Sequence, residues 1–587
     1  MASFSFSTLP TTFSGSPSFS KASSHRFKVS CNAASGDTNH PETTPKLITS
    51  LDMTHNVDRR NLLLGLGGLY GAANFTSLPS AFATPIAAPD NIADCVTASS
   101  NLQNPTDVVR GLACCPPALS SKPEIYTLPV NPVTRIRPAA QRATPEYIEK
   151  YKAAIQEMRK LPDDHPHSFK QQAMIHCAYC NGAYNQEQSG HPELQLQIHN
   201  SWLFYPFHRW YLYFYERILG KLINDPTFAI PHWNWDHPTG MMLPAMFEDA
   251  DPALKQNPIF DPYRDVTHLP PAILDAEYAG ANTGADCVNQ ISSNLASMYR
   301  QMITNATDTT SFSGGEFVSG DDPLQAGTLI AGSIERGIHT AMHRWVGNPR
   351  MANNEDMGNF YSAGYDPVFY VHHANVDRMW KIWNNASYVF YDENEKLVRV
   401  FNKDSIDIGR MGYDYERSSV PWLQSRPVAH AKRSKAAAQS VGTVKKVEDV
   451  EFPVKLDQVV KVLVKRPATN RTKEDKEKAH EILLLNGIKF DGEKFVKFDV
   501  FVNDVDDGIE TTAAESEFAG SFAQLPHGSH SEKMLMTSGA RFGITELLED
   551  IEAEDDEYVL VNLVPKIGCD DAIVSEIKIE LVPIVQT

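Results

Sequence analysis

Two groups of three histidines have the residue types and spacings expected of metal ligands. His339 and His343 stand four residues apart, so a helix would place both rings on one face. Neutral imidazole binds both copper and zinc, but neither group contains the glutamate of a His-Glu-x-x-His zinc motif. The six are His176, His199 and His208 in the first group and His339, His343 and His373 in the second. Two all-histidine groups among aromatic residues predict a pair of copper ions.

Each histidine taken alone has a simpler explanation. A single histidine beside apolar residues is more often a hydrogen-bonded core residue than a ligand. A pair four residues apart, such as His339 and His343, also arises by chance in helices. The order and surroundings of all six together favour ligands.

Amphipathic stretches of helical length surround both groups. Examples are Thr144–Leu161 and Asn200–Leu222, and aromatic residues are dense from Thr84 to Trp422. Apolar residues that recur with the helical period predict helices. We therefore expect residues 84–425 to form one large, mainly helical domain that holds the histidines.

The hydrophobic pattern changes near residue 426. Residues 426–447 are poor in large apolar side chains and rich in basic ones, which is typical of an exposed, protease-accessible linker. Beyond this linker, apolar and polar side chains alternate in Val459–Lys465, Lys494–Asn503 and Glu576–Leu581. A period of two predicts strands, so residues 448–587 are expected to form a small β-sandwich or barrel.

Residues 1–83 have the composition of a targeting leader in two parts. The first 30 residues contain no Asp or Glu and many Ser and Thr, which is typical of a plastid transit peptide. Arg59 and Arg60 then precede the apolar run Leu62–Ala73, and Ala81–Ala83 supplies a small-x-small processing pattern. We expect import into the plastid and then into the thylakoid lumen.

The alternatives for the apolar run in the leader are a buried N-terminal helix or a secretory signal. The run is shorter than the roughly 20 residues of a membrane-spanning helix. No membrane-spanning segment is therefore expected in the mature chain.

The charge of the chain excludes one class of partner. The 587 residues include 53 basic and 72 acidic side chains, which gives a formal charge of -19. A basic surface for phosphate backbones is not expected, so nucleic acid is not a predicted partner. A neutral or weakly charged small substrate fits better.

The segments around the histidines resemble the tyrosinase and polyphenol oxidase family, and its plant members in particular. His199–Glu216 is similar to the family's first copper-site motif and Asp366–Arg378 to its second. By position in the second motif the ligand is His373 rather than His372. Lys497–Val500 resembles the hallmark of the plant enzymes' C-terminal domain.

This resemblance implies a binuclear type-3 copper centre that uses dioxygen as co-substrate. The implied ligands are His176, His199 and His208 for one copper and His339, His343 and His373 for the other. The implied activity oxidises small o-diphenols to o-quinones and reduces dioxygen to water. A tyrosinase, a specialised aurone or lignan oxidase and a haemocyanin-like oxygen carrier are the alternatives. Asp377 is a candidate for orienting a histidine, unless it pairs with an arginine.

Four further residues are site candidates by the same resemblance. Glu335 matches a glutamate that holds a water near the phenol, and Phe360 matches a gate over the second copper, unless it only packs in the core. Thr340 stands where enzymes that hydroxylate monophenols often have Asn, which favours diphenol oxidation. Arg344 could stack over an aromatic or acidic substrate.

The resemblance also implies how the cysteines pair. The implied disulfides are Cys95–Cys115 and Cys114–Cys177, and they require an oxidising compartment. Cys180 would form a thioether with His199 and stop that imidazole from rotating. A free, buried Cys180 thiol is the alternative.

The C-terminal domain has an implied regulatory role. In the family it covers the copper site, so we expect latency until a protease cuts the linker or acid or detergent acts. A folding chaperone or an oligomerisation module are the alternatives for this domain. The sequence predicts no oligomeric state.

Overall fold

The computed structural model describes residues 89–583 except for 90, 93, 99–108, 118–122, 131, 187–190, 249–256, 283, 316–329, 381–386, 402–404, 406–407, 417, 428–443, 505–510 and 527–534. The predicted leader, residues 1–83, lies outside the described residues. Most of the predicted linker, residues 426–447, lies outside them as well.

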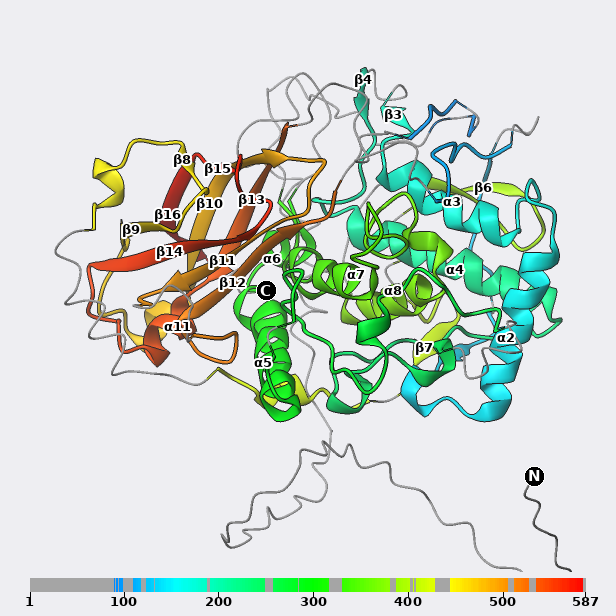
Figure 1. Cartoon of the computed structure of the whole chain (residues 1–587), viewed down its shortest axis with the longest axis horizontal. Coiled ribbons are helices and arrows are strands. Elements are labelled where there is room, and N and C mark those ends of the chain that lie inside the picture. Colours follow the sequence, from blue (N-terminus) through cyan, green and yellow to red (C-terminus); the bar gives the residue numbers. More distant parts are fainter. Residues whose placement is uncertain are drawn as a thin grey trace, which may run out of the picture. The chain divides into compact units, whose positions relative to one another are not determined.

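Helices around one apolar core form the domain that precedes the linker (Figure 1). They are α2 (Pro145–Lys160), α3 (Phe169–Cys180), α4 (Phe204–Leu222), α5 (Cys287–Tyr299), α6 (Thr309–Ser313), α7 (Thr340–Val346) and α8 (Val368–Met379). Two π-helical turns, Arg300–Thr304 and Glu335–His339, follow α5 and precede α7. Every residue of α4 from Phe204 to Glu216 is buried, because this segment is largely apolar on all its faces.

The ends of α2 follow from its sequence. The Thr144 hydroxyl accepts a hydrogen bond from the backbone N–H of Tyr147 at 3.3 Å. Pro145 stands in the first turn, where its missing N–H leaves no bond unmade. The helix expected at Thr144–Leu161 is confirmed as α2.

Helix α4 begins four residues later than the amphipathic pattern predicts. Asn200 has a φ of 62°, a left-handed conformation that an α-helix does not accept. The helix therefore begins at Phe204. Pro206 lies in its first turn, where a proline is tolerated.

Short strands connect distant parts of the helical domain. They are β1 (Glu124–Ile125), β2 (Arg135–Arg137), β3 (Asn185–Gln186), β4 (His191–Gln195), β5 (Ser387–Tyr391), β6 (Leu397–Phe401) and β7 (Tyr413–Tyr415). Strand β2 pairs in parallel with β7, and this pairing sets Arg137 opposite Tyr415.

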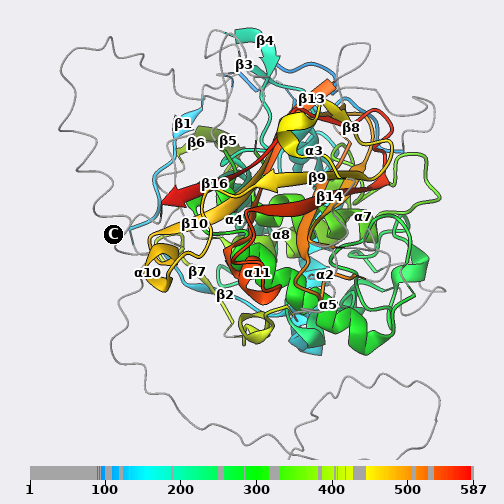
Figure 2. The same cartoon turned by 90° about the vertical axis from the view of Figure 1, so that its left-hand side faces the viewer.

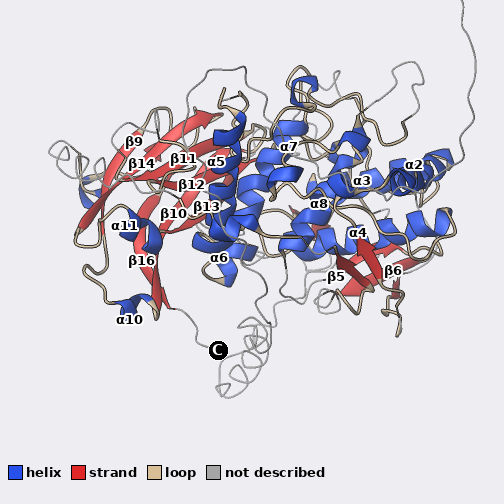
Figure 3. Ribbon diagram, turned by 90° about the horizontal axis from the view of Figure 1, so that it is seen from below, coloured by secondary structure: helices blue, strands red, loops and turns tan. Residues whose placement is uncertain are grey.

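The C-terminal domain consists of two antiparallel sheets (Figures 2 and 3). Its elements are β8 (Val454–Lys455), β9 (Val460–Lys465), α10 (Lys473–Lys476), β10 (Ala479–Asp491), β11 (Val496–Val502), β12 (Phe518–Gln524), β13 (Leu535–Gly543), α11 (Thr545–Asp550), β14 (Tyr558–Ile567), β15 (Ile573–Val574) and β16 (Glu576–Pro583). One sheet has the order β12-β11-β14-β9, and the other has β13-β10-β15-β8 with β16 paired to β10.

The two sheets enclose a second apolar cluster, which confirms the expected β-sandwich. The three segments with alternating side chains become β9, β11 and β16. None of the helices in the described ranges combines the length and apolar character that crossing a membrane requires.

Candidate metal centre

Four helices, a π-helical turn and one loop bring all six predicted ligands together. Figures 1 and 3 show α3, α4, α7 and α8 gathered in the helical domain. His176 lies on α3, His199 on the loop before α4, His208 on α4, His339 at the end of a π-helical turn, His343 on α7 and His373 on α8. All six side chains are buried.

The histidines form two adjoining groups, as the sequence predicts. Donor atoms of the first group, His176, His199 and His208, lie within 4.8 Å of one another, and so do those of the second group. The groups meet where the rings of His208 and His373 stack with centroids 4.0 Å apart. Two metal ions held by these groups would therefore be neighbours.

Backbone carbonyls fix the orientation of four of the rings through their Nδ1 atoms. The four contacts are His176 to Phe360 at 2.9 Å, His208 to Phe204 at 2.7 Å, His339 to Glu335 at 3.1 Å and His343 to Met357 at 2.7 Å. A ring that donates its Nδ1–H keeps the lone pair on Nε2, and a carbonyl partner of this kind orients metal-binding histidines.

The free ring nitrogens fit copper. Among the described residues, Nε2 of His208 and Nε2 of His339 are buried without a hydrogen-bond partner. Burial lowers the pKa of His208 to about 3 and that of His343 to about 4, so both imidazoles are neutral donors. Two groups of neutral imidazoles, with no carboxylate among them, suit two copper ions.

Cys180 lies beside the first group. It is one helical turn after His176, and its sulfur is within 4.8 Å of the donor atoms of that group. The thiol is buried and carries no disulfide, and burial raises its pKa well above the usual value. This position places Cys180 within reach of His199, the predicted thioether partner.

One disulfide closes a loop within the N-terminal arm, and another connects the arm to α3. The structure contains the bonds Cys95–Cys115 and Cys114–Cys177, with Cα–Cα distances of 5.6 and 5.8 Å. Cys177 follows His176 directly, so the second bond attaches the arm next to a predicted ligand.

Glu335 and Thr340 occupy the π-helical turn and the residue that follows it. The buried Glu335 carboxylate accepts a hydrogen bond from the N–H of Asn200 at 2.7 Å, next to His199. Burial raises the pKa of Glu335 to about 8, which favours the neutral acid at pH 7. A metal ion bound nearby would favour the ionised carboxylate instead. The Thr340 hydroxyl donates to the carbonyl of Glu335 at 2.8 Å, so it is already used by the backbone.

Phe360 and Arg344 both lie beside other aromatic rings. The ring of Phe360 is 4.4 Å from that of His199 and 5.7 Å from that of His176, so it packs on the first histidine group. The Arg344 guanidinium lies 5.1 Å from the ring centre of Phe495 in the C-terminal domain. An aromatic side chain of the chain itself thus occupies the face of Arg344 where a substrate was expected.

Asp377 binds arginines and tyrosines instead of a histidine. Its carboxylate accepts hydrogen bonds from Arg209 Nε, from Arg137 Nη1 at 3.0 Å and from the hydroxyls of Tyr413 and Tyr415 at 2.5 Å each. Burial alone would raise the pKa of Asp377, but these partners outweigh burial and hold it below the usual value.

The sequence interpretation missed most of this buried cluster. Glu216 completes it by binding Arg135 Nε and Arg137 Nε, each at 2.9 Å. Arg135 and Arg137 are two residues apart on β2, and Tyr413 and Tyr415 are two residues apart on β7. In a strand such residues point to the same face, and β2 pairs with β7, so all four side chains lie on one face. That alternation is the one signal in the sequence that could have indicated the cluster.

His372 joins the second group, although the motif assigns the ligand to its neighbour His373. It is buried, and a ring nitrogen of His372 lies within 4.8 Å of the donor atoms of His339, His343 and His373. The structure therefore places four imidazoles where three were predicted.

Family models match three parts of the chain. The common central domain of tyrosinase matches residues 166–386, and the polyphenol oxidase middle domain matches 381–428. The chloroplastic polyphenol oxidase C-terminal domain matches residues 452–581. These matches cover both the histidine groups and the β-sandwich.

Curated proteins and solved structures resemble the chain over most of its length. A chloroplastic polyphenol oxidase of Malus domestica is 46% identical, covering 92% of this chain and 90% of its own length. A chloroplastic (+)-larreatricin hydroxylase of Larrea tridentata is 41% identical, covering 94% of each. The structure of a latent aurone synthase (polyphenol oxidase) is 51% identical, with a TM-score of 0.80, and covers 85% of this chain and 99% of its own.

The Asp377 cluster generates a prediction about stability. Asp377→Asn removes the charge that two buried arginines share, and removing one partner of a buried ion pair costs about 3–5 kcal/mol. Urea unfolding of the protein should show a loss of free energy of unfolding of that size. Asp414→Asn is the control, because Asp414 lies between the two tyrosines of β7 but is exposed. Equal unfolding midpoints for the two variants would contradict the role of the cluster.

Proposed function

The chain belongs to the plant polyphenol oxidase family, and from this we propose that it oxidises o-diphenols to o-quinones while it reduces dioxygen to water. The observation that carries the proposal is the meeting of two groups of buried, neutral imidazoles. Two copper ions, when bound, supply the electron transfer between phenol and dioxygen. The proposed ligands are His176, His199 and His208 for one ion and His339, His343 and His373 for the other.

The residues of the chain hold the site in shape and control protons. Carbonyls that bind Nδ1 keep the rings of His208 and His343 in a fixed orientation. The Glu335 carboxylate is held by the Asn200 N–H, and its Oε2 atom has no hydrogen-bond partner among the described residues. We propose that this oxygen holds a water that accepts the proton of the incoming phenol. Phe360 packs on His199 and narrows the space above it.

The substrate is proposed to be a diphenol rather than a monophenol. An Asn after His339 could present its amide to a water near Glu335, whereas Thr340 uses its hydroxyl on the Glu335 carbonyl. Once Phe495 has moved away, the planar guanidinium of Arg344 can stack on the ring of an aromatic substrate or pair with an acidic group.

A specialised hydroxylase or synthase remains the second candidate function. The (+)-larreatricin hydroxylase and the latent aurone synthase are both more than 40% identical to this chain. Such enzymes share the histidine groups, so the distinction depends on the substrate and not on the metal centre.

Activity on a panel of phenols tests the reaction. Copper-loaded protein without its C-terminal domain should produce quinone from 4-methylcatechol continuously and act several times more slowly on tyramine. Thr340→Asn should raise the tyramine rate and leave the 4-methylcatechol rate nearly unchanged. Equal rates on the two substrates would contradict the diphenol preference, and oxygen binding without quinone formation would indicate a carrier.

We further propose a thioether between Cys180 and His199. Its formation removes one hydrogen from the thiol and one from a ring carbon of the imidazole, a two-electron oxidation for which dioxygen is the oxidant. The bond would fix His199, whose position on a loop gives it less support than a helix gives.

Peptide mass spectrometry after full reduction tests the thioether, because reduction breaks disulfides and leaves a thioether intact. Peptides carrying Cys180 and His199 should stay joined, with a mass two hydrogen atoms below their sum. Cys180→Ser is the control and should give separate peptides. Alkylation of Cys180 in the reduced, denatured wild-type protein would contradict the proposal.

We propose that the C-terminal domain keeps the enzyme latent. Phe495, Ala523 and Leu525 of this domain are buried in the same apolar cluster as the residues around the histidines. Phe495 also covers Arg344. These shared contacts support a shielding role for the C-terminal domain rather than a separate module.

Charged and polar contacts hold the C-terminal domain in place. Lys497 Nζ donates to the carbonyl of Glu277 at 2.6 Å and lies 3.2 Å from its carboxylate. Ser521 donates to the same carboxylate at 2.7 Å. A second ion pair joins Arg541 to Asp308 at 3.2 Å.

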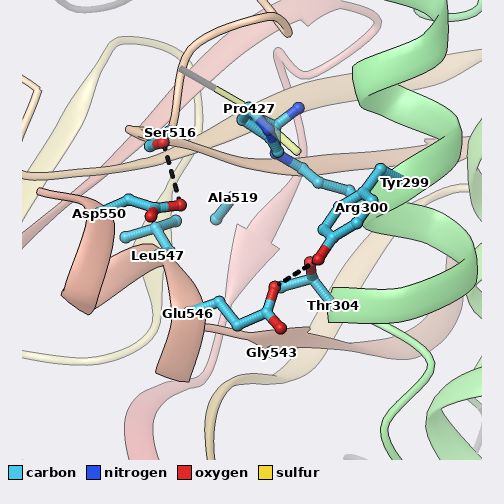
Figure 4. Close-up of a pocket in the computed structure, with 10 residues that line it drawn as sticks. All are labelled: Tyr299, Arg300, Thr304, Pro427, Ser516, Ala519, Gly543, Glu546, Leu547 and Asp550. Carbon is cyan, nitrogen blue, oxygen red and sulfur yellow. Dashed lines mark hydrogen bonds between the residues drawn. The ribbon is translucent and has the colours of Figure 1, made fainter. Parts of the chain in front are cut away.

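The helical domain also binds the outermost strands of the two sheets. Asn305 donates to the carbonyl of Ala519 at 3.1 Å and accepts from the N–H of Gly543 at 2.9 Å, so one amide joins β12 to β13. Figure 4 shows the pocket beside this contact, where the Tyr299 hydroxyl donates to Glu546 at 3.0 Å. Edge strands bound in this way have no free partner groups at that point.

The Lys497 contact offers a test of latency. Lys497→Met removes the cation that binds the partly buried Glu277 carboxylate. A hydrogen bond to a charged group contributes at least about 1.5 kcal/mol, and its loss shifts an equilibrium about tenfold. Full-length K497M should oxidise 4-methylcatechol up to that much faster than full-length wild type. Removal of the C-terminal domain should make the two identical, since the substitution then leaves with the domain.

The control for this test is Lys489→Met, an exposed lysine of the same domain. It should leave the full-length activity unchanged. Equal activity of the full-length and trimmed wild-type proteins would contradict latency.

The domain limits and the location are proposed on the same basis. We assign residues 84–425 to the catalytic domain, 426–447 to a linker that a protease cuts and 448–587 to the shielding domain. The curated relatives named above are chloroplastic, and a chloroplast location follows for this chain. The two-part leader, residues 1–83, and the two disulfides support the thylakoid lumen as its compartment.

A further inference from the structure

The second histidine group contains one imidazole more than a type-3 copper site uses. His372 is completely buried, and its ring centre lies 5.4 Å from that of His339 and 5.1 Å from that of His343. A ring nitrogen of His372 lies within 4.8 Å of the donor atoms of His339, His343 and His373. The fourth imidazole therefore faces the same point as the three predicted ligands.

Neither ring nitrogen of His372 has a hydrogen-bond partner among the described residues. Unpartnered buried nitrogens are not by themselves a sign of a ligand, but those of His372 lie in a group of four imidazoles whose donor atoms converge. By contrast, His339 and His343 each direct Nδ1 to a carbonyl. Nδ1 of His373 is also buried without a partner among the described residues, but only His372 has both ring nitrogens in that state within this group.

The positions of His372 and His373 suggest different tasks. The ring of His373 stacks on His208 at 4.0 Å, so it lies where the two groups meet. The described ring contacts of His372 are with the second group and with Trp235, 6.0 Å away. His373 is thus placed to complete the binuclear centre, whereas His372 approaches the second copper position from outside it.

The spacing of the donors allows a metal to pass from one imidazole to the next. A metal–imidazole bond is about 2.0–2.1 Å long, so two nitrogens up to about 4.2 Å apart can share one ion. Nitrogens within 4.8 Å reach that separation with a small rotation of a ring, and the ring of His372 has no hydrogen bond within the described protein that would oppose the rotation.

Resting on the proposed copper function, we propose that His372 is an accessory copper donor that binds the incoming ion while the second site is loaded. The ion bound by His372 and by His339 or His343 then transfers to the three-histidine set. Each exchange replaces one imidazole with another, so the ion is never left without ligands in an apolar interior. No change of oxidation state is involved.

Copper uptake by metal-free, full-length protein tests this role. Two near-isosteric variants differ in one donor atom: His372→Met carries a thioether that binds copper, and His372→Leu does not. Uptake is followed by competition with a coloured copper chelator, and final copper content is measured by elemental analysis. His372→Leu should load its second copper at least about tenfold more slowly, the scale expected for a residue that supports a metal site, and His372→Met should load close to the wild-type rate.

His232→Leu is the matched control. His232 is also buried with both ring nitrogens unpartnered among the described residues, but it belongs to neither donor group. It should load copper at the wild-type rate. Equal slowing in His232→Leu would overturn the proposal, because loss of a buried imidazole anywhere in the interior would then explain the effect. Equal uptake rates in the Leu and Met variants of His372 would also overturn it, because the donor atom would then have no influence.

Two further readouts separate the possible failures. Urea unfolding of the metal-free proteins shows whether each variant folds, and His372→Gln, a polar but poor copper donor, replaces His372→Leu if the latter does not fold. If the wild-type protein binds two copper ions and all variants load copper at the same rate as it does, only the role of His372 as an accessory donor is refuted. Wild-type protein that binds no copper refutes the proposed function itself.

Discussion

The buried carboxylate of Asp377 joins the elements on which the metal centre depends. It lies on α8 four residues after His373, and it binds Arg209, the residue directly after His208 on α4. Arg137 brings β2 to the same carboxylate, and the two tyrosines bring β7. Removing one charge from such a cluster leaves the others buried and uncompensated, so the cluster ties α4 to α8 as long as all its members are present. The rings of His208 and His373, which stack at 4.0 Å, lie on these two helices.

Helix backbones supply the second constraint on the site. The carbonyl of Phe204, one helical turn before His208, orients the ring of His208. At the end of the π-helical turn the Thr340 hydroxyl binds the carbonyl of Glu335, five residues earlier. Rings held through Nδ1 need no carboxylate partner, so the centre contains little negative charge beyond Glu335. Burial lowers the pKa values of His208 and His343 although their contacts with carbonyls oppose the shift, so both imidazoles stay neutral and available.

The sequence predicted those features that depend on local pattern. Helical amphipathicity predicted α2, alternation predicted β9, β11 and β16, and motif spacing predicted the two histidine groups. It did not predict features that depend on contacts between distant segments. Asp377 was assigned to a histidine because the two are neighbours in sequence, yet its partners come from residues about 240 and 168 positions away. Arg344 was assigned to a substrate because nothing local indicated that Phe495 would cover it.

The covering domain and the metal centre are connected through one short element. The π-helical turn Glu335–His339 carries a predicted ligand at its end, and Arg336 within it donates to the backbone carbonyl of Arg541 on β13. Burial lowers the pKa of Arg336 to about 9, so the guanidinium is kept in the interface at a cost in solvation. Departure of the C-terminal domain would remove this contact from the turn that carries Glu335 and His339. Activation of this enzyme would therefore change the support of the second copper site as well as uncover it.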